Sequence, residues 1–352
     1  MAAGGGIRED VMTMRAARYH GPGTPLRLET VAVRPPARGE ALVRIRAAGV
    51  CHTDLHFLSG VLDLGIAPLT LGHEIAGEVA QVGADVSAVA PGDRVVVFYY
   101  ATCGGCHWCR TGRENLCPQV AAEYGFTADG GYAEYIVVPA ANLVKLPVGL
   151  DLAEAATLGC SVATAVHAAS GVARVRVGDT VVVYGAGGVG FGLIQYCKLA
   201  GARVIAVSRS AARRAKAREL GADAVVDGVK GVGEEVRALT GGEGADVLFE
   251  LVGVKETMGQ AVMALRRRGR LVFIGYSADP LVVSPLQLVI GELVVTASVG
   301  NTLEELLQAV NLAAAGKIRP VVDRRVSLDE LPATLEALRK GEIVGRAVVV
   351  FP

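Results

Sequence analysis

The sequence is poor in aromatic residues and carries no net charge. Aromatic side chains make up 5% of its 352 residues, and only one of them is tryptophan. This scarcity, beside 45 glycines, suggests tight backbone turns rather than an aromatic-lined binding surface. Lysine plus arginine and aspartate plus glutamate number 35 each. Such a balance argues against a protein held on nucleic acid or anionic lipid by bulk electrostatics, so we expect neither partner.

Long apolar runs are also missing from the sequence. No stretch of eighteen apolar residues occurs, and we expect no membrane span. The first eleven residues are rich in alanine and glycine, then charged, and lack the apolar core of a secretory signal. We predict a flexible lead there, with Met12 or Met14 as an alternative start, and a cytoplasmic location. In that reducing compartment, the clustered thiols among the seven cysteines are expected to bind metal rather than form disulfides.

Length and hydrophobic periodicity predict two domains of the α/β class. The first part reads as short strands broken by turns, at residues 41–47, 78–82 and 94–98. After a helix at 152–169, strands alternate with helices, which indicates βαβ units and a parallel sheet. The strands are expected at 180–184, 203–207, 224–226, 247–251 and 271–274, and the helices after Gly190, at 211–220 and at 256–265. Helices at 303–314 and 328–340 and a strand at 347–351 form a tail that can rejoin the first domain.

Four cysteines lie close together with the spacing C-x2-C-x2-C-x7-C. Two glycines between the first pair tolerate a tight turn, and the four thiolates can close a tetrahedral shell around a structural zinc. Four free thiols, a redox pair or an iron–sulfur cluster are the alternatives. The predicted ligands are Cys103, Cys106, Cys109 and Cys117.

A second metal position is suggested by Cys51, His73 with Glu74, and Cys160. Two thiolates and an imidazole leave a fourth site open for water or substrate, as a catalytic zinc requires. Taken singly, Cys160 on an alanine-rich helix reads as a core residue and His73 as a hydrogen-bonded histidine. Spacing alone cannot join residues so far apart in the chain.

A glycine-rich loop follows the strand at 180–184 and opens a helix. This G-x-G-x-x-G pattern in a strand–loop–helix context is typical of dinucleotide binding. Gly185 makes the turn, Gly187 admits the pyrophosphate and Gly190 lets the helix pack on the strand, while the helix N-terminus favours the phosphates. The cofactor-binding residues predicted in the loop are Gly185, Gly187, Gly188, Val189 and Gly190.

The end of the next strand bears on the choice of nicotinamide cofactor. NAD-binding proteins usually place a carboxylate there, but this sequence has Ser208 and Arg209. A guanidinium and a hydroxyl suit a 2′-phosphate, so NADP(H) is favoured over NAD(H). The alternative for Arg209 is a solvated residue at the start of a helix.

Several of these motifs, in order, resemble a zinc-dependent alcohol dehydrogenase of the medium-chain dehydrogenase/reductase superfamily. The string from Gly49 to His56, the string from Gly72 to Glu78, the cysteine cluster, Cys160 and the glycine loop carry the resemblance. It covers nearly the whole chain, from about Arg15 to Phe351. It implies that Cys51, His73 and Cys160 hold a catalytic zinc, with Glu74 beside it as a transient ligand.

The resemblance also implies roles for residues around that zinc. Asp54 matches the carboxylate that orients the ligand histidine, with a structural salt bridge as its alternative. Thr53 and His56 match a relay that passes a proton by way of the cofactor ribose to solvent; a plain surface histidine is the alternative for His56. His52 is expected to face the pyrophosphate. Arg346 resembles an arginine that reaches the pyrophosphate from the tail, or else forms a salt bridge at the rim.

The sequence thus predicts a GroES-like catalytic domain (1–160), a Rossmann domain (161–297) and a returning tail (298–352). Its predicted function is hydride transfer between NADP(H) or NAD(H) and an alcohol, aldehyde or ketone, with one catalytic and one structural zinc. The alternatives are an enoyl-thioester reductase of the same superfamily and a non-catalytic structural or regulatory relative. An apolar strand at 292–298 would be an exposed edge in a monomer, so a homodimer or homotetramer is expected.

Overall fold

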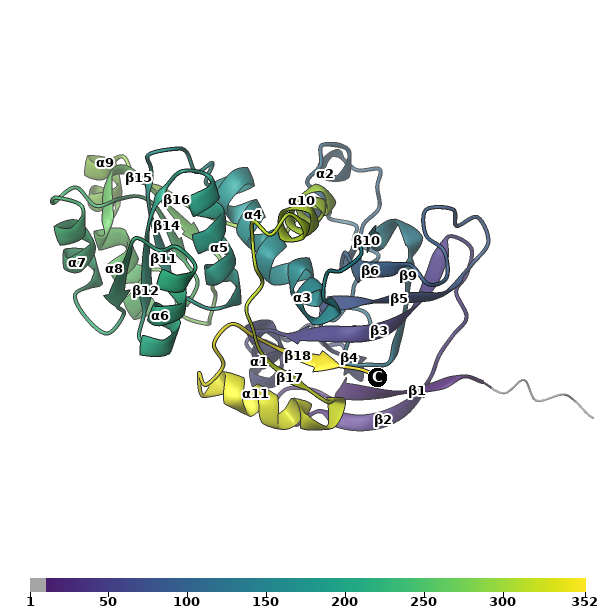
Figure 1. The fold of residues 1–352 in the computed structure, drawn as a ribbon. Coiled ribbons are helices and arrows are strands. Elements are labelled where there is room, and N and C mark those ends of the chain that lie inside the picture. Colours follow the sequence, from purple (N-terminus) through teal and green to yellow (C-terminus); the bar gives the residue numbers. More distant parts are fainter. Residues whose placement is uncertain (1–10) are drawn as a thin grey trace, which may run out of the picture.

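The computed structural model describes residues 11–352 (Figure 1). Apart from Val11, the predicted N-terminal lead lies outside the described residues. A β-rich part, purple to blue in Figure 1, stands beside a part with a parallel sheet and helices, drawn in green. The predicted combination of a β-rich domain and a doubly wound domain is confirmed.

The β-rich part holds two main sheets. The smaller one has the order β2-β1-β4, and the larger one β10-β6-β5-β3-β18-β17, with β9 also paired to β3. The strands of the smaller sheet are β1 (Thr13–Tyr19), β2 (Arg27–Ala32) and β4 (Leu69–Thr70). Those of the larger sheet are β3 (Glu40–Val50), β5 (Glu74–Val82), β6 (Arg94–Val97), β9 (Tyr135–Pro139), β10 (Leu143–Lys145), β17 (Val322–Val326) and β18 (Arg346–Val350). A short ribbon pairs β7 (Tyr100–Ala101) with β8 (Ala122–Glu123).

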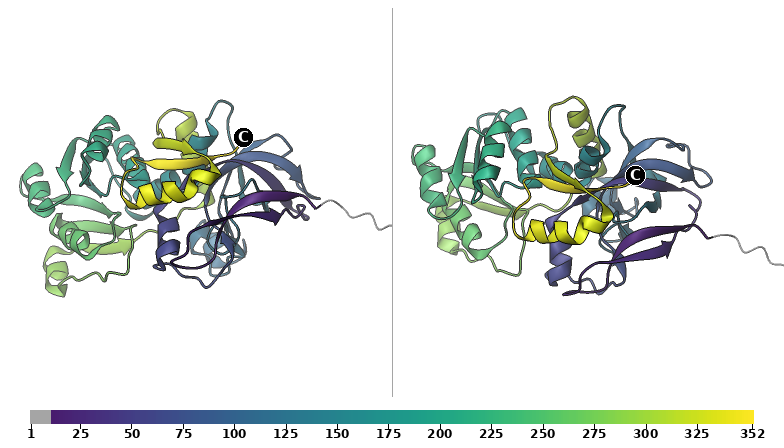
Figure 2. Two further views of the ribbon diagram at one scale, coloured as in Figure 1. Left: turned by 90° about the horizontal axis from the view of Figure 1, so that it is seen from below. Right: turned by 60° about the horizontal axis from the view of Figure 1, so that its bottom comes forward.

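The last strand of the chain joins the strand that precedes the first candidate ligand. β18 pairs antiparallel with the end of β3, so that Ala347 lies opposite Val50. Both strands are apolar and buried, as expected for neighbours in the middle of a sheet. Figure 2 shows the yellow C-terminal segment lying against the purple strands. Residues near 346 are thereby brought next to residue 51.

The second part is a six-stranded parallel sheet in the order β13-β12-β11-β14-β15-β16. This order reverses beside β11, and dinucleotides bind at the carboxyl ends of the strands at such a point. The strands are β11 (Thr180–Tyr184), β12 (Arg203–Ser208), β13 (Ala224–Asp227), β14 (Ala245–Glu250), β15 (Leu265–Phe273) and β16 (Val294–Ala297). The helices are α5 (Gly188–Leu199), α6 (Ala211–Glu219), α7 (Val232–Leu239), α8 (Lys255–Met263) and α9 (Pro285–Gly291).

A long buried helical run connects the two parts. It consists of α3 (Leu152–Thr157), the π-helical η3 (Leu158–Val162), α4 (Ala163–Val166) and the π-helical η4 (His167–Val172). By length and composition the 21-residue run Leu152–Val172 could cross a membrane, but 78% of its apolar window is buried inside the structure, as in a core helix. The expected domain boundary between residues 160 and 161 falls within this run.

In residues 11–352, four further α-helices lie outside the parallel-sheet part and the connecting run. They are α1 (His52–Ser59), α2 (His107–Arg110), α10 (Leu303–Ala314) and α11 (Leu331–Arg339), with short 3-10 turns η1 (Glu114–Leu116), η2 (Ala140–Asn142) and η5 (Leu328–Glu330). The helix predicted at 328–340 is divided into η5 and α11. The side chains of Ser327 and Glu330 form a capping box around η5, and a proline stands in the first turn of α11.

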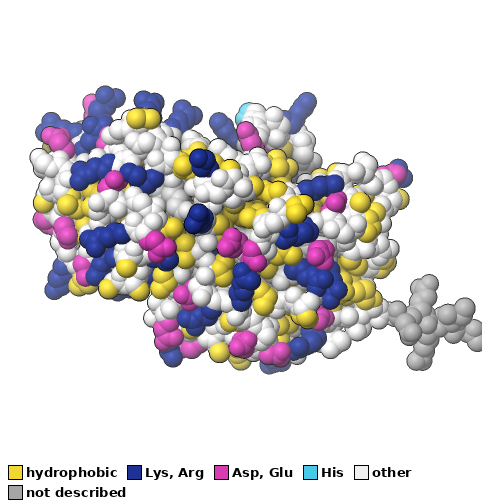
Figure 3. Space-filling model, in the orientation of Figure 1, with side chains coloured by type: hydrophobic (Ala, Val, Ile, Leu, Met, Phe, Trp, Pro, Cys, Tyr) yellow, Lys and Arg dark blue, Asp and Glu magenta, His cyan; other side chains and the backbone are white. Residues whose placement is uncertain are grey.

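Charges of both signs are mixed over the surface. On the face drawn in Figure 3, blue and magenta side chains alternate over both parts. This pattern agrees with the zero formal charge of the chain.

Candidate active site

Four candidate ligands from separate elements meet at one point. Cys51 is the N-cap of α1, and Cys160 lies in the π-helical η3. His73 directly precedes β5, and Glu74 is the first residue of that strand. One ligand atom from each lies within 4.8 Å of the others. Cys51, His73 and Glu74 are buried, and Cys160 is partly buried. The structure therefore brings together the three separated segments that the sequence could join only by resemblance.

Local backbone features shape this position. The π-helical turn at Cys160 interrupts an α-helix, a feature that frequently marks functional sites. Gly49 on β3 lies opposite Glu74 on β5, and a Cβ at Gly49 would lie 2.0 Å from a carboxylate oxygen of Glu74. Only glycine therefore leaves room for the buried Glu74 carboxylate beside the ligand position.

The buried ligand groups shift one another's pKa values. A hydrogen bond from Cys160 lowers the pKa of Cys51 well below its usual value, and the Arg346 guanidinium lowers it further. Burial lowers the pKa of His73, but the hydrogen bond and negative charge of Cys51, with the Asp54 carboxylate, bring it to about 9. Burial raises the pKa of Glu74 to about 7. Sulfur and imidazole donors held together in this way are the set that zinc prefers.

Glu74 and Arg346 form a buried ion pair beside the ligands. The Nε atom of Arg346 lies 3.0 Å from Oε1 of Glu74, and its Nη2 atom lies 3.5 Å from Sγ of Cys51. The side chain of Arg346 is 6% exposed and that of Glu74 is 0% exposed. A Cβ at Gly188 would lie 2.5 Å from Nη1 of Arg346, so the same guanidinium contacts the glycine loop. Arg346 thus joins the candidate metal position to the candidate cofactor loop.

The carboxylate of Asp54 binds the start of α1 and acts electrostatically on His73. Its Oδ2 atom accepts hydrogen bonds from the backbone N–H of Cys51 at 2.9 Å and from the hydroxyl of Tyr132 at 2.7 Å. Among the described residues, Oδ1 of Asp54 and Nδ1 of His73 are buried without a hydrogen-bond partner. The capping box of α1 engages the Oδ2 atom of Asp54 and leaves Oδ1 unbonded, and the orienting role of Asp54 toward His73 stays a prediction.

Thr53 and His56 lie on α1, one turn apart, and therefore share a helix face. The thiol of Cys51 donates to Oγ1 of Thr53 at 3.6 Å, so the hydroxyl borders the metal position. The ring of His56 lies 4.5 Å from the ring of Tyr276, with a 31° angle between the planes. Desolvation lowers the pKa of His56, which keeps its imidazole neutral at pH 7. A hydroxyl at the ligands and a neutral imidazole farther out form an arrangement suited to proton transfer.

Aromatic rings gather around His73, contrary to what composition suggested. The ring centroid of Phe126 lies 4.8 Å from that of His73, and the centroid of Tyr99 lies 5.5 Å from it. The hydroxyls of Tyr99 and Tyr100 are 3.2 Å apart. The low aromatic content of the whole chain therefore did not predict how many aromatic rings lie around His73. No sequence pattern placed residues 99 and 126 beside residue 73.

The glycine loop has the geometry of a dinucleotide loop. Gly185 follows β11 with φ +116, and a Cβ at Gly190 would lie 2.1 Å from the carbonyl oxygen of Gly185. Gly187 is the N-cap of α5, and Gly188 and Val189 form its first turn, where free N–H groups favour anions. His52 is exposed on α1; desolvation and the charges of Arg346 and Arg213 lower its pKa.

The residues at the end of β12 differ in how far they are already bonded. Ser208 is buried and its Oγ accepts from the N–H of Ser210, whereas Arg209 is exposed. Arg213 donates to the carbonyl of Ile343 at 2.9 Å, and Arg214 pairs with Asp227 at 3.1 Å. Arg209 makes no side-chain hydrogen bond among the described residues.

The cysteine cluster is a separate lobe. Four of the six Sγ–Sγ distances are 3.5–3.9 Å, too long for a disulfide, and all four thiols are free. Hydrogen bonds from the backbone N–H groups of Cys106 and Gly105 lower the pKa of Cys103 to about 6. The lobe is fastened to α10 and its approach, since Glu114 accepts from the N–H of Leu303 and Asn115 donates to the carbonyl of Val299, both at 2.9 Å.

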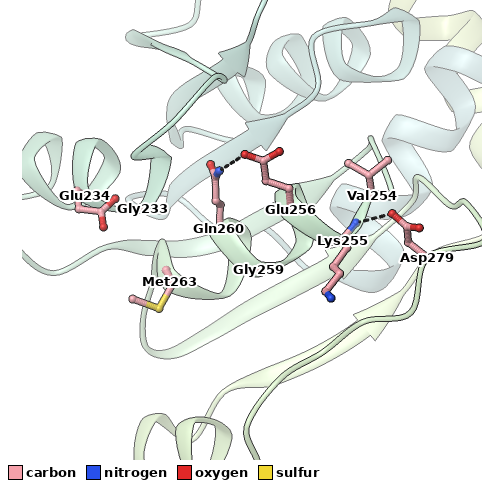
Figure 4. Close-up of a pocket in the computed structure, with 9 residues that line it drawn as sticks. All are labelled: Gly233, Glu234, Val254, Lys255, Glu256, Gly259, Gln260, Met263 and Asp279. Carbon is pink, nitrogen blue, oxygen red and sulfur yellow. Dashed lines mark hydrogen bonds between the residues drawn. The ribbon is translucent and has the colours of Figure 1, made fainter.

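A hollow of about 740 Å³ lies apart from these groups, between α7 and α8 (Figure 4). Lys255 donates its N–H to Asp279 there at 2.9 Å, and Gln260 donates to Glu256 at 3.4 Å. None of the nine residues that line the hollow is a predicted site residue. We assign it no part in the active site.

Two family models match the chain. A model of the alcohol dehydrogenase GroES-like domain matches residues 37–148, and a model of zinc-binding dehydrogenases matches residues 188–315. The alcohol dehydrogenase of Geobacillus stearothermophilus is 38% identical over 316 residues, which is 88% of this chain and 91% of that protein. The chain belongs to the zinc-dependent alcohol dehydrogenase family.

Other alcohol dehydrogenases agree with this assignment. The NAD-dependent alcohol dehydrogenase of Sulfurisphaera tokodaii is 35% identical over 349 residues, 96% of this chain and all of that protein. The crystal structure of the alcohol dehydrogenase of Aeropyrum pernix superposes with a TM-score of 0.91 at 36% identity, covering 96% of this chain and all of that one. These matches confirm the predicted family, the GroES-like and Rossmann-type fold, and the prediction that the chain is an enzyme. None of these alcohol dehydrogenases supports the alternative that the chain is a non-catalytic protein.

Proposed function

We propose that the chain interconverts alcohols and carbonyl compounds at the position formed by Cys51, His73 and Cys160, with NADP(H) as the preferred cofactor. The carrying observation is the convergence of four ligand atoms within 4.8 Å, linked by Arg346 to the glycine loop. The buried imidazole of His73 and the two thiols form a donor set that fits zinc. Glu74 is the fourth residue of the cluster. Its carboxylate can act as a transient metal ligand, because Arg346 can hold it in an ion pair when it does not bind the metal.

A bound zinc would supply a Lewis acid for the substrate oxygen, and a nicotinamide would supply the hydride acceptor or donor. The chain itself supplies positions and proton transfer. Thr53, beside Cys51, takes the proton of the substrate hydroxyl on Oγ1 as its own proton leaves toward His56. The imidazole of His56, kept neutral by desolvation, accepts it and passes it to solvent. Asp54 holds the N–H of Cys51 and so fixes the start of α1.

The preference for NADP(H) is argued from Arg209. Its guanidinium is exposed at the carboxyl end of β12, where a dinucleotide places its adenosine ribose. Arg214 is paired with Asp227 and Arg213 is bonded to the C-terminal segment, so that of these three arginines only Arg209 has no partner among the described residues. A 2′-phosphate could form charge-assisted hydrogen bonds to Arg209 and to Ser208. His52 and Arg346 would then face the pyrophosphate.

We also propose a second, structural zinc in the cysteine lobe. Four free thiols, with four of their six Sγ–Sγ distances at 3.5–3.9 Å, suit a closed tetrahedral shell. Its role would be mechanical, because Glu114 and Asn115 of the lobe hold the segment that leads into α10.

The division of labour between domains is part of the proposal. Residues 1–160 and the tail 298–352 form the catalytic domain, and residues 161–297 bind the cofactor. The pairing of β18 with β3 and the separate parallel sheet support this division. The helical run Leu152–Val172 would then belong partly to each domain and connect the two. The free thiols suit a reducing compartment, and we propose the cytoplasm.

We propose a homodimer or homotetramer joined through the edge of the parallel sheet. β16 is the outer strand, and Val294 on it is 49% exposed. The neighbouring α9 exposes Leu286, Val289 and Ile290 by 62–73%. An unpaired apolar edge of this kind is normally covered. Light scattering of the wild type and of Val294→Asp measures the state; a monomeric wild type would exclude the proposal.

The central experiment is a rate assay with NADPH or NADH and a panel of aldehydes and ketones beside α,β-unsaturated thioesters. Rapid cofactor oxidation with a carbonyl compound, faster with NADPH, is the expected result. Oxidation only with the unsaturated thioester would replace the proposal by an enoyl-thioester reductase. Metal analysis should find about two zinc ions per chain, one for each cluster of donors.

A further inference from the structure

Tyr276 extends from the parallel-sheet part of the molecule onto α1. It follows β15, at the carboxyl edge of the sheet where dinucleotides bind. Its ring lies 4.5 Å from that of His56, tilted by 31°. No sequence pattern places residue 276 beside residue 56. The two residues are far apart in the chain, one before the glycine loop and the other after it.

The backbone around Tyr276 is held in place by close contacts. Gly253 has φ +77, and a Cβ there would lie 2.6 Å from the Cα of Tyr276. The hydroxyl of Ser277 donates to the carbonyl of Gly253 at 2.6 Å, and the N–H of Gly275 donates to the carbonyl of Glu250 at 3.0 Å. The turn that carries Tyr276 is therefore fixed to the ends of β14 and β15.

The phenol of Tyr276 reaches the other member of the relay. Desolvation raises its pKa to about 12, and a hydrogen bond with Thr53 partly offsets this rise. The phenol is thus protonated at neutral pH and can donate. The ring of Tyr276, 44% exposed, lies against His56, and its hydroxyl lies near enough to Thr53 for the two hydroxyls to share a hydrogen bond.

We propose that Tyr276 is a positioning residue for the Thr53–His56 pair. Its ring restricts the imidazole of His56, and its hydroxyl fixes the direction of the Thr53 hydroxyl. The two relay residues lie on α1 of the β-rich part, whereas Tyr276 belongs to the parallel-sheet part. The relay is therefore aligned only when these two parts are in contact. This inference rests on the proposed function and adds a residue that none of the sequence motifs contains.

The kinetic test compares Tyr276→Phe, which keeps the ring, with Tyr276→Ala, which removes both contacts. Loss of one oriented hydrogen bond should lower kcat for alcohol oxidation by about tenfold in Tyr276→Phe and further in Tyr276→Ala. The KM and Kd for the cofactor should stay within about twofold, since Tyr276 acts through the relay. Tyr135→Phe, on β9, is the matched control and should behave as the wild type. Unchanged kcat in both Tyr276 variants would overturn the inference.

A second measurement does not depend on turnover. The chain has six histidines, so His56 can be assigned in the NMR spectrum of histidine-labelled enzyme with a His56→Gln variant. Its ring signals should move in Tyr276→Ala, where the stacked ring is lost, and stay in place in Tyr276→Phe. Identical signals in Tyr276→Ala and the wild type would overturn the contact itself. If the wild type turned over no alcohol or carbonyl compound with either cofactor, the proposed function would fail and the positioning role with it, even where the signals confirm the contact.

Discussion

Arg346 and Glu74 are 272 positions apart in the chain and form an ion pair of 3.0 Å with both side chains buried. The pair exists because β18 returns to lie beside β3. The same guanidinium lies 3.5 Å from Cys51 and against Gly188. One arginine therefore balances the negative charge at the ligands and borders the loop where a pyrophosphate would lie.

Replacing Arg346 by glutamine should weaken both the fold and cofactor binding. It leaves the Glu74 carboxylate buried without its partner, which typically costs about 3–5 kcal/mol of unfolding free energy. Denaturant unfolding and cofactor titration measure the two effects. Arg339→Gln, on the exposed side of α11, is the control and should change neither. A wild-type cofactor Kd in Arg346→Gln would mean that the pyrophosphate is bound elsewhere.

Removing Cys51 should remove one metal ion and the activity together. Cys51→Ala deletes a ligand at the open position, so zinc content is expected to fall from about two to about one per chain. Cys197→Ala is the control, because that buried thiol lies within α5, away from both clusters. Elemental analysis and turnover are measured on the same samples. Full turnover in Cys51→Ala would show that the catalytic metal is not held there.

Arg209→Asp should shift cofactor preference toward NADH. The substitution removes the exposed cation at the end of β12 and places a carboxylate where a ribose diol could bind it. The ratio of kcat/KM for NADPH over NADH should fall by about 10- to 100-fold, equal to about 1.4–2.7 kcal/mol. Arg218→Asp, at an exposed position on the following helix α6, makes the same charge change and is the control. An equal shift in both variants would point to overall charge rather than to a phosphate site.

The order of strands and helices was readable from the sequence because each depends on local periodicity. The strand Thr180–Tyr184 and the helix Leu303–Ala314 were predicted with the bounds that the structure has. The start of β5 was missed by four residues, since Glu74 to Gly77 carry no alternation and become a strand only by pairing with β3. The start of β15 was missed for a related reason: its first residues include a run of arginines that reads as a turn.

The active site was predictable only in part. The four-cysteine lobe is local and stood out by spacing, whereas Cys51, His73 and Cys160 were joined by resemblance and meet only in the folded chain. The role of Asp54 in capping α1 was not predicted, although a carboxylate three residues after an N-cap is a local signal for a capping box. Tyr276 had no sequence signal, because its contact with His56 is set by how the two parts of the molecule approach each other.

His56→Gln should slow alcohol oxidation and change its pH dependence. The imidazole acts as a base only when neutral, so the wild-type rate should fall as the pH drops through the pKa of His56. Desolvation lowers that pKa, and the fall therefore lies below about pH 6.5. In His56→Gln this limb should disappear and kcat at pH 8 should be about ten- to a hundredfold lower. An unaltered pH profile would assign the proton path to another group; His20→Gln, bonded to Glu29 away from the site, is the control.

The stability of the chain should depend on pH through Glu305. His167 donates from Nδ1 to Oε1 of Glu305 at 2.8 Å, and the same carboxylate accepts from the N–H of Thr302 at the start of α10. Burial raises the pKa of Glu305, but these bonds and the histidine lower it more, so its folded value lies below the ordinary one. A carboxyl whose pKa is depressed by folding stabilises the protein above its unfolded pKa and loses this contribution as the pH falls through the folded pKa.

Glu305→Gln should therefore lose about 1–3 kcal/mol of unfolding free energy at pH 7, the usual worth of a hydrogen bond to a charged group. The difference from the wild type should shrink as the pH falls below about 4.5, where the wild-type carboxyl also becomes neutral. Denaturant unfolding between pH 3 and 7 measures it. Glu304→Gln, the exposed neighbour, should show no such trend. A difference that stayed constant down to pH 3 would mean that the packing of residue 305, rather than its charge, holds α10 against the helical run at His167.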